Sequence, residues 1–291
     1  MGLSRIQALD CFASDDLIGI GMEADAVRRR LHPEGVVTYA IDGSIDAAAT
    51  SADTAKSLQT IDDLGGTSLL LKGPVASLDA LEALIRDAKR HFPQISIAGL
   101  TCAEIVQAAG SLSLPETLLR LHDAGMDSIG SADPEAPHPL WLDVHRAAHR
   151  AGMKTATTIV FGAGETLEQR VDALAAIANL QSETGGFIAV APVSFHAVGG
   201  RELDEATAVE YLKTLAITRL LLDGIPNVQS DWTTQGLKIL QMGLRFGAND
   251  AGSVRVEHAQ RTTEEEMRRI IRDAGFRPCQ RDLLYRAMML T

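Results

Sequence analysis

The sequence predicts an α/β protein built as one (β/α) barrel of seven or eight βα units, with helical additions at both ends. Short apolar runs rich in β-branched residues alternate with longer helical patterns over most of the 291 residues. No change in composition divides the chain, and one large barrel accommodates this length. The alternative is an open doubly wound sheet, but no G-x-G-x-x-G follows an expected strand, which weakens its dinucleotide-binding form.

The expected strands are short apolar runs bounded by turn residues. In chain order they cover residues 36–41, 67–71, 95–99, 128–130, 155–161, 187–191 and 227–230, with a weaker eighth at 244–246. Helices of suitable length lie between them. Residues 77–92, for example, place Leu81 and Ile85 on one helical face.

The two ends of the chain predict helices outside the repeating pattern. Residues 1–34 form a helical lead-in to the first strand, and residues 261–291 form a C-terminal helix and tail. In the tail, Thr262 or Thr263 caps a helix with acidic residues in its first turn, and Gly275 ends it. We expect a single domain over the whole chain.

The charge balance excludes some classes of partner. The formal net charge is −11 and the pI is near 5.2, which argues against nucleic acid or an anionic membrane surface. No apolar run reaches the length of a membrane span, and the N-terminal segment lacks the apolar core of a signal peptide. We therefore expect a cytoplasmic protein whose partner is a small-molecule substrate.

The metal-binding residue types form no convincing set. The three cysteines, Cys11, Cys102 and Cys279, are far apart, which argues against a disulfide framework and a metal knuckle. His145 and His149 have a helical spacing that can grip a metal, but no acidic residue lies between them. A solvated helix face is the preferred interpretation of this pair, and we expect no bound metal.

The carboxyl ends of barrel strands carry the functional site. The residues that follow the expected strands include acids, bases and hydrogen-bonding groups. The candidate catalytic residues are Lys72, Glu104, Glu165, His196 and Asp231. The candidate substrate-binding residues are Asp42, Ser194, Trp232, Gln235, Asn249 and Asp250. The passage after Asp42, "GSIDAAATSADTAKSL", has no cysteine, histidine or aromatic residue.

Several candidates also have a structural interpretation. Glu165 precedes a helix and could serve only as a capping carboxylate. His196 suits a general base, but equally a hydrogen bond to the backbone. Asp231 and Trp232 could anchor a loop, because a buried indole needs a hydrogen-bond partner. Lys72 follows an apolar strand and suits a Schiff base, a phosphate-binding group or a solvated ion-pair partner.

A family likeness runs from about residue 23 to about residue 286. Its most distinctive part is "DGIPNVQSDWTTQG" followed by "FGANDAGS", and other parts are "ADAVRRRLHPEGVVTYAID", "VFGAGETLEQRVDAL" and "AGFRPCQRDLLYR". The chain resembles the radical S-adenosylmethionine (SAM) enzymes of the menaquinone pathway, which include cyclic dehypoxanthinyl futalosine synthase and aminofutalosine synthase and are related to FO synthase. The resemblance implies a barrel of the TIM or radical SAM type.

The resemblance also shows where this chain departs from its family. It implies that the strand containing Tyr39 runs into a loop with a C-x-x-x-C-x-x-C motif, whose three thiolates hold a [4Fe–4S] cluster that binds and cleaves SAM. Here that loop is shorter and lacks cysteine, Lys72 and Pro74 depart from the expected Gly-Gly, and the segment after the fourth strand is shortened. We expect no [4Fe–4S] cluster and no other cofactor, with SAM retained at most as a non-radical ligand.

Two functions follow from these departures. The first is a cluster-free paralogue that performs polar chemistry of lyase, isomerase or hydrolase type on a small polar metabolite in the retained pocket. The second is a non-catalytic binding or partner protein for a radical SAM enzyme of the menaquinone pathway. The sequence leaves the oligomeric state open.

Overall fold

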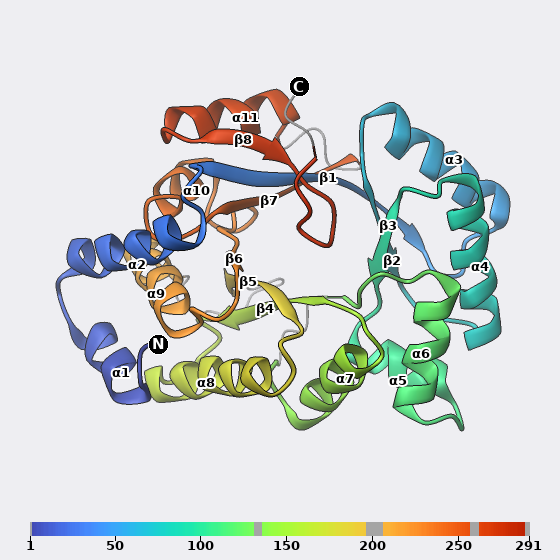
Figure 1. Ribbon diagram of the computed structural model, residues 1–291, viewed down its shortest axis with the longest axis horizontal. Helices are drawn as coiled ribbons and strands as arrows, with labels where there is room; N and C mark the ends of the chain where they lie inside the picture. Colours follow the sequence, from blue (N-terminus) through green and yellow to red (C-terminus); the bar gives the residue numbers. More distant parts are fainter. Residues whose placement is uncertain (1, 131–135, 196–205, 257–261, 289–291) are drawn as a thin grey trace.

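Figure 1 shows parallel strands enclosed by helices in the computed structural model, which describes residues 2–130, 136–195, 206–256 and 262–288. The strands are β1 (Val36–Asp46), β2 (Ser68–Lys72), β3 (Ser96–Gly99), β4 (Thr155–Phe161), β5 (Phe187–Ser194), β6 (Asn227–Val228), β7 (Asp250–Arg255) and β8 (Arg277–Gln280). The helices are α1 (Arg5–Ala13), α2 (Leu17–Leu31), α3 (Ser51–Asp63), α4 (Leu78–His91), α5 (Cys102–Ala109), α6 (Leu114–Ala124), α7 (Pro139–Arg150), α8 (Leu167–Thr184), α9 (Ala208–Leu221), α10 (Leu237–Gly243) and α11 (Glu264–Asp273). The predicted α/β barrel architecture is confirmed.

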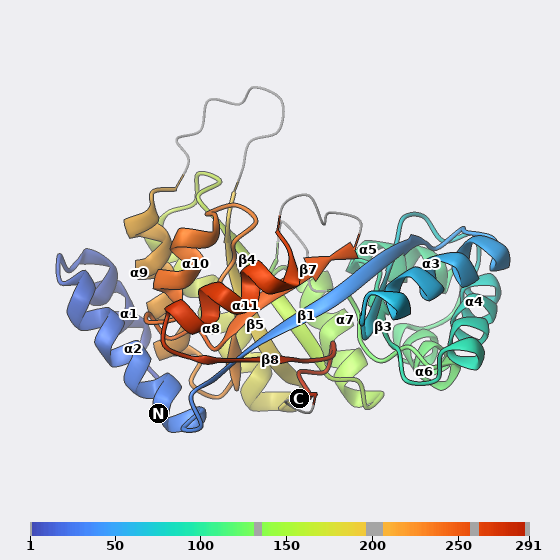
Figure 2. The same cartoon turned by 90° about the horizontal axis from the view of Figure 1, so that it is seen from above.

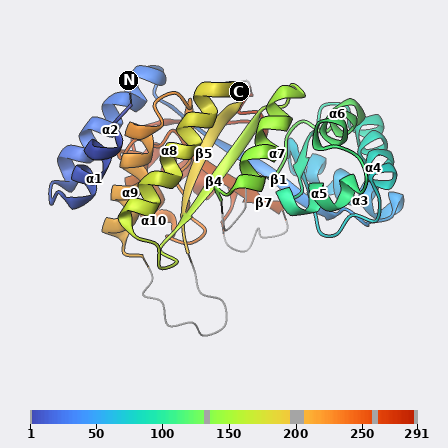
Figure 3. The same cartoon turned by 90° about the horizontal axis from the view of Figure 1, so that it is seen from below.

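The strands form two parallel sheets. One has the order β3-β2-β1-β7, with β8 also paired to β1, and the other has the order β4-β5-β6. A parallel bridge between Gln229 and Asp250 joins the two sheets on the β6–β7 side. Figure 3 shows α3 to α6 together at one end of the molecule and α1, α2, α8 and α9 at the other. In the described ranges, no helix is both long enough and apolar enough to span a bilayer.

β1 is longer than expected and continues to Asp46. Thr38 pairs in register with Asp250 of β7 and with Cys279 of β8, so β8 lies on the edge of β1 opposite to β7. From Asp42 onward β1 pairs with β2. Figure 2 shows β8 crossing near the beginning of β1, at the amino end of the barrel. The sequence that looked like a bare loop is therefore strand as far as Asp46, followed by a short link to α3.

The expected fourth strand is irregular. The N–H of Ser128 donates to the carbonyl of Ile97 at 3.3 Å, and the N–H of Gly130 donates to that of Gly99 at 2.7 Å. A Cβ at Gly130 would lie 2.5 Å from the carbonyl oxygen of Leu100. The segment therefore takes a strand's place beside β3 without forming a regular strand, and its close approach to Leu100 requires glycine at position 130.

The eighth strand expected at 244–246 is wrong. Leu244 caps α10 through its N–H, which donates to the carbonyl of Leu240 at 3.1 Å, and the chain then turns toward β7. A short apolar run fits a helix end as well as a strand. β7 gives little apolar signal because its sequence, DAGSVR, is small and polar, and β8 lies in the expected tail.

His145 and His149 do not lie on a solvated face, so the preferred interpretation of this pair is wrong. His145 is fully buried, and Thr155 Oγ1 lies 2.9 Å from its Nδ1 and 2.8 Å from His149 Nε2. Trp141 and Phe187 pack on these rings, with centroids 4.1 Å and 5.1 Å from that of His145. The histidines and the hydroxyl tie α7 to the start of β4.

We expect the free energy of unfolding to fall as the pH drops from about 6.5 to about 4. Burial lowers the pKa of His149 to about 4 and the pKa of His145 well below 6.5, so the unfolded chain binds more protons in this interval. The free energy of unfolding therefore rises with pH over this interval. Acidification from a pH of about 6.5 to about 4 should lower it by about 2 kcal/mol or more. Urea unfolding at a series of pH values measures this effect. The slope should be shallower in His149→Gln, and equal slopes in both proteins would contradict the assignment.

Candidate functional site

A pocket of about 200 Å³ lies at the carboxyl ends of β2, β3 and β7. It brings together two predicted catalytic residues, Lys72 at the end of β2 and Glu104 in the first turn of α5, and adds Arg255 at the end of β7. The remaining lining residues are Leu70, Leu71, Gly73, Gly99, Leu100, Thr101 and Gly130. This is the barrel end at which parallel strands place functional groups.

The wall beside α5 is fixed by backbone geometry. Thr101 and Glu104 form a capping box, in which the Thr101 N–H donates to the Glu104 carboxylate at 2.6 Å and the Glu104 N–H donates to Thr101 Oγ1 at 3.2 Å. Leu100 has a positive φ of 62°, which is unfavourable for a leucine. A Cβ at Gly99 would lie 2.2 Å from the carbonyl oxygen of Leu71, so only glycine allows β3 this close to β2.

The two cationic side chains of the pocket contact residues of β1. Lys72 Nζ donates to Ser44 Oγ at 2.9 Å. Arg255 Nε lies 3.8 Å from Asp42 Oδ1. Asp42 is buried in the middle of β1, so the strand end expected just before it is wrong, although it still lies next to Arg255 of the pocket. Its side chain lies beside Arg255, because the two residues are paired in register on β1 and β7.

Glu165 holds the loop after β4. Its carboxylate accepts the N–H groups of Gly162 at 2.8 Å and Ala163 at 2.9 Å, and Arg170 donates to it at 2.6 Å. Burial opposes ionisation, but the Gly162 N–H and the Arg170 guanidinium outweigh it and lower the pKa of Glu165. An ionised carboxylate with these partners suits loop capping better than proton transfer.

Asp231 closes the loop after β6. The buried carboxylate accepts the N–H of Thr233 at 3.0 Å and that of Thr234 at 3.1 Å, together with both hydroxyl groups. These bonds agree with the loop-anchoring interpretation. Trp232 beside it is 9% exposed and packs in the core.

Ser194 and Gln235 meet at the carboxyl end of β5. Ser194 Oγ donates to Thr234 Oγ1 at 2.9 Å and accepts a hydrogen bond from Gln235 Nε2 at 2.8 Å. They lie on the β5–β6 side and do not line the pocket that contains Lys72. His196 lies outside the described residues.

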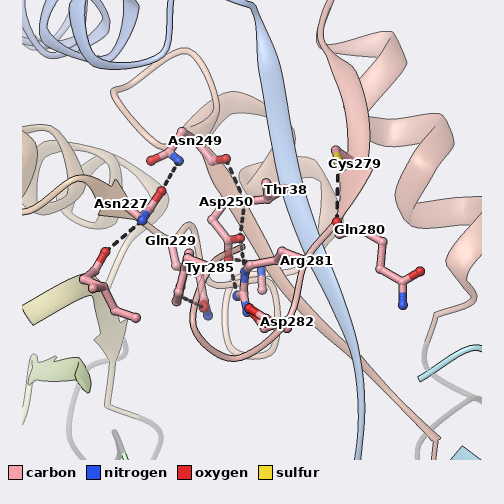
Figure 4. A network of polar contacts seen from close by, with 12 residues as sticks. Thr38, Asn227, Gln229, Asn249, Asp250, Cys279, Gln280, Arg281, Asp282 and Tyr285 are labelled. Carbon is pink, nitrogen blue, oxygen red and sulfur yellow. Dashed lines mark hydrogen bonds and ion pairs between the residues drawn. The ribbon is translucent and has the colours of Figure 1, made fainter. Parts of the chain in front are cut away.

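Asn249 and Asp250 belong to the opposite end of the barrel, which corrects their expected place at the mouth. Asp250 begins β7 and Asn249 directly precedes it; neither follows a strand at 244–246, because that expected strand does not exist. Asp250 forms a bidentate salt bridge with Arg281, with distances of 2.6 Å to Nε and 2.8 Å to Nη2. It also accepts a hydrogen bond from Thr38 Oγ1 at 2.6 Å. Figure 4 shows this network, in which Arg281 Cζ also lies 3.8 Å from the centroid of the Tyr285 ring.

The distinctive C-terminal signature has a structural role at this end. Asn249 Oδ1 accepts a hydrogen bond from Arg219 Nη2 at 2.6 Å and one from the Val228 N–H at 2.9 Å. Arg219 also donates to the carbonyls of Gly247 at 2.8 Å and Pro226 at 3.0 Å. The buried guanidinium thus fixes α9, β6 and the turn before β7.

Comparisons with known proteins decide the family. A family model described as "CofH/MqnC C-terminal region" matches residues 184–290. The cyclic dehypoxanthine futalosine synthase of Streptomyces coelicolor is 31% identical over 98% of this chain and 85% of that protein. The chain belongs to the cyclic dehypoxanthine futalosine synthase family.

Other relatives agree with this placement. The aminodeoxyfutalosine synthase of Thermus thermophilus is 34% identical over 70% of this chain and 63% of that protein. The crystal structure of methylornithine synthase matches with a TM-score of 0.69 at 13% identity, over 96% of this chain and 94% of that one, which shows a shared fold. The alignment with the Streptomyces protein runs over 339 positions, which is more than the 291 residues of this chain. Some segments of that relative therefore have no counterpart here.

The residues of this family member do not fit a [4Fe–4S] cluster of the kind that the radical SAM resemblance implies. Cys11 lies on α1, Cys102 on α5 and Cys279 on β8, which Figure 1 shows on different sides of the barrel. Burial raises the pKa of the Cys11 and Cys279 thiols, whereas a cluster needs thiolates. Among the described residues, no three His, Cys, Asp or Glu side chains gather as a metal-binding group.

Sequence reasoning missed two arginines in this futalosine synthase relative. Arg255 lines the pocket, and Arg281 organises the opposite end. The polar–apolar alternation of "SVRV", residues 253–256, is a strand signal that could have found Arg255. Arg281 follows β8 in a segment with no such alternation, and only the fold places it inside the barrel.

Proposed function

We propose that this chain is a cluster-free member of its family that binds a small polar metabolite at the barrel mouth and performs non-radical chemistry of lyase, isomerase or hydrolase type. The observation that carries the proposal is the convergence of Lys72, Glu104 and Arg255 on one pocket at the carboxyl ends of the strands. SAM enters this proposal only as a non-radical ligand.

The three side chains have complementary roles in such chemistry. The ammonium of Lys72 stabilises negative charge that develops on an oxygen of the substrate. Glu104 keeps one carboxylate oxygen on the Thr101 N–H and uses the other to take up or deliver a proton. Arg255 binds the substrate and orients it relative to Lys72 and Glu104.

Two conservative variants test the enzyme role. The full chain is incubated with small carbonyl- or enol-bearing metabolites, and consumption is followed by mass spectrometry. We expect Lys72→Met and Glu104→Gln to lower turnover about a hundredfold. Glutamine also completes a capping box, so Glu104→Gln keeps the start of α5 intact. The exposed Lys154, which contacts the carbonyl of Gly185, supplies the control Lys154→Met. Equal turnover in all four proteins would contradict the assigned roles.

A second candidate is a non-catalytic binding or partner protein for a radical SAM enzyme of the pathway. It is favoured by the use of Glu165 and Asp231 in loop structure, which leaves fewer groups for acid–base chemistry. Sedimentation of this chain mixed with a purified cyclic dehypoxanthine futalosine synthase tests it. A stable complex would favour the partner role, and independent sedimentation would exclude that pairing.

A further inference from the structure

The charge of the mouth pocket contrasts with that of the chain as a whole. The chain has a net charge of −11, yet the described lining of the pocket includes two cations, Lys72 and Arg255, together with the carboxylate of Glu104, and the Asp42 carboxylate lies 3.8 Å from Arg255. The Glu104 carboxylate is already bonded to the Thr101 N–H at the start of α5. Cations gathered in a concave site raise the local concentration of anions.

Arg255 reaches this pocket from a distant strand. β1 lies between β7, which carries Arg255, and β2, which forms the pocket with β3. The arginine therefore extends past β1, on which the buried Asp42 is its partner in register. Its Nε is 3.8 Å from Asp42 Oδ1, which exceeds hydrogen-bond length. Asp42 holds the guanidinium by charge and leaves its fork of N–H donors available to a ligand.

Lys72 suits an electrostatic role better than a covalent one. A lysine that forms a Schiff base is activated by burial in an apolar pocket or by a neighbouring cation. Lys72 is exposed, and its ammonium donates to Ser44 Oγ at 2.9 Å. An exposed ammonium is a compact positive charge, which is the form that attracts anions.

The pocket is small and its wall is stiff. Its volume of about 200 Å³ lies below the range of about 300–1,000 Å³ that is typical of drug-sized ligands. Leu100 in the wall has a φ of 62°, and such strained residues gather at ligand-binding sites, where the surrounding structure enforces them. A compact acid fits these dimensions better than a nucleoside.

We propose that the mouth pocket binds a compact anionic group, a carboxylate or a phosphate, between Lys72 and Arg255. The inference rests on the proposed function and narrows its substrate class from a small polar metabolite to a small acid. Arg255 is the main specificity residue, because its planar donors can grip two oxygens of one anion. Asp42 is the residue that positions it.

Calorimetric titration of the full chain with inorganic phosphate and with oxalate, at constant ionic strength set by chloride, tests the proposal. We expect saturable binding of at least one of them, with one site per chain. Arg255→Met and Lys72→Met should each weaken binding at least tenfold, as expected for lost charge-assisted hydrogen bonds. The Arg255→Lys variant should keep the positive charge but lose the bidentate hydrogen bonding to the anion. It should therefore bind the anion with intermediate affinity. The preferred probe distinguishes a phosphate-bearing from a carboxylate-bearing substrate.

Matched controls exclude a general charge effect. Arg29 on α2 is 64% exposed and Lys154 precedes β4, so Arg29→Met and Lys154→Met remove the same charges outside the pocket and should bind like wild type. Absence of saturable binding, or equal binding in all variants, overturns the inference. If turnover of a neutral metabolite depends on Lys72 while neither anion binds, the inference fails and the proposed function stands. If the anions bind but nothing is turned over, the inference stands and the enzyme role fails.

Discussion

Replacing Arg281 with alanine should lower the free energy of unfolding by about 3–5 kcal/mol. The Arg281 and Asp250 side chains are 3% and 0% exposed and pair through two hydrogen bonds of 2.6 Å and 2.8 Å. The variant leaves a carboxylate buried without its counter-charge and removes the support beneath the Tyr285 ring. Urea unfolding of the purified variant measures the loss.

Two further proteins make this result specific. Arg286 lies in the same segment and pairs with Asp282, but it is 66% exposed, so Arg286→Ala should cost about 1 kcal/mol or less. Adding Asp250→Asn to Arg281→Ala removes the unpaired charge and should recover part of the stability. A cost for Arg281→Ala as small as that for Arg286→Ala would show that the pair is not a structural anchor.

Anaerobic reconstitution with iron and sulfide should leave the protein without a stoichiometric cluster. A [4Fe–4S] site would give about four iron atoms per chain and a broad absorption near about 400 nm. The three thiols lie on α1, α5 and β8, and the link from β1 to α3 contains no cysteine. Thiols with a raised pKa, as at Cys11 and Cys279, are also poor ligands.

A protein with an established [4Fe–4S] cluster, treated in parallel, controls for the procedure. Adventitious iron is removed by gel filtration with a chelator, after which the iron content of this chain should fall close to zero. Retention of about four irons with the absorption band would restore radical chemistry as the leading function. It would also contradict the cluster-free proposal directly.

The barrel could be predicted because periodicity is local. The apolar runs of β2, β4 and β5 and the amphipathic pattern of α4 identify elements whose faces must be buried, and burial of such faces requires the layered architecture. Lys72 and Glu104 were expected near the carboxyl ends of β2 and β3, and the structure has Lys72 as the last residue of β2 and Glu104 in the first turn of α5, which follows β3.

Errors arose where contacts between distant segments decide the structure. Leu244 and Phe246 resemble a strand, but they complete the turn after α10, and this moves Asn249 and Asp250 to the amino end of the barrel. Likewise, Asp42 resembled a strand end because nothing local shows that β2 pairs with β1 as far as Asp46. His145 was expected on a solvated face, but the rings of Trp141 and Phe187 pack on it in the fold.

The sequence by itself determined the fold class, the family likeness and the absence of a cysteine motif after β1, because each is encoded in residue order and spacing. Only the tertiary structure decided which polar groups share a site. Arg255 reaches the Lys72 pocket across β1, and Arg281 pairs with Asp250 from 31 residues away. Buried charge must find its partner through the folded chain, so its partner is set by strand order and register, which no local pattern specifies.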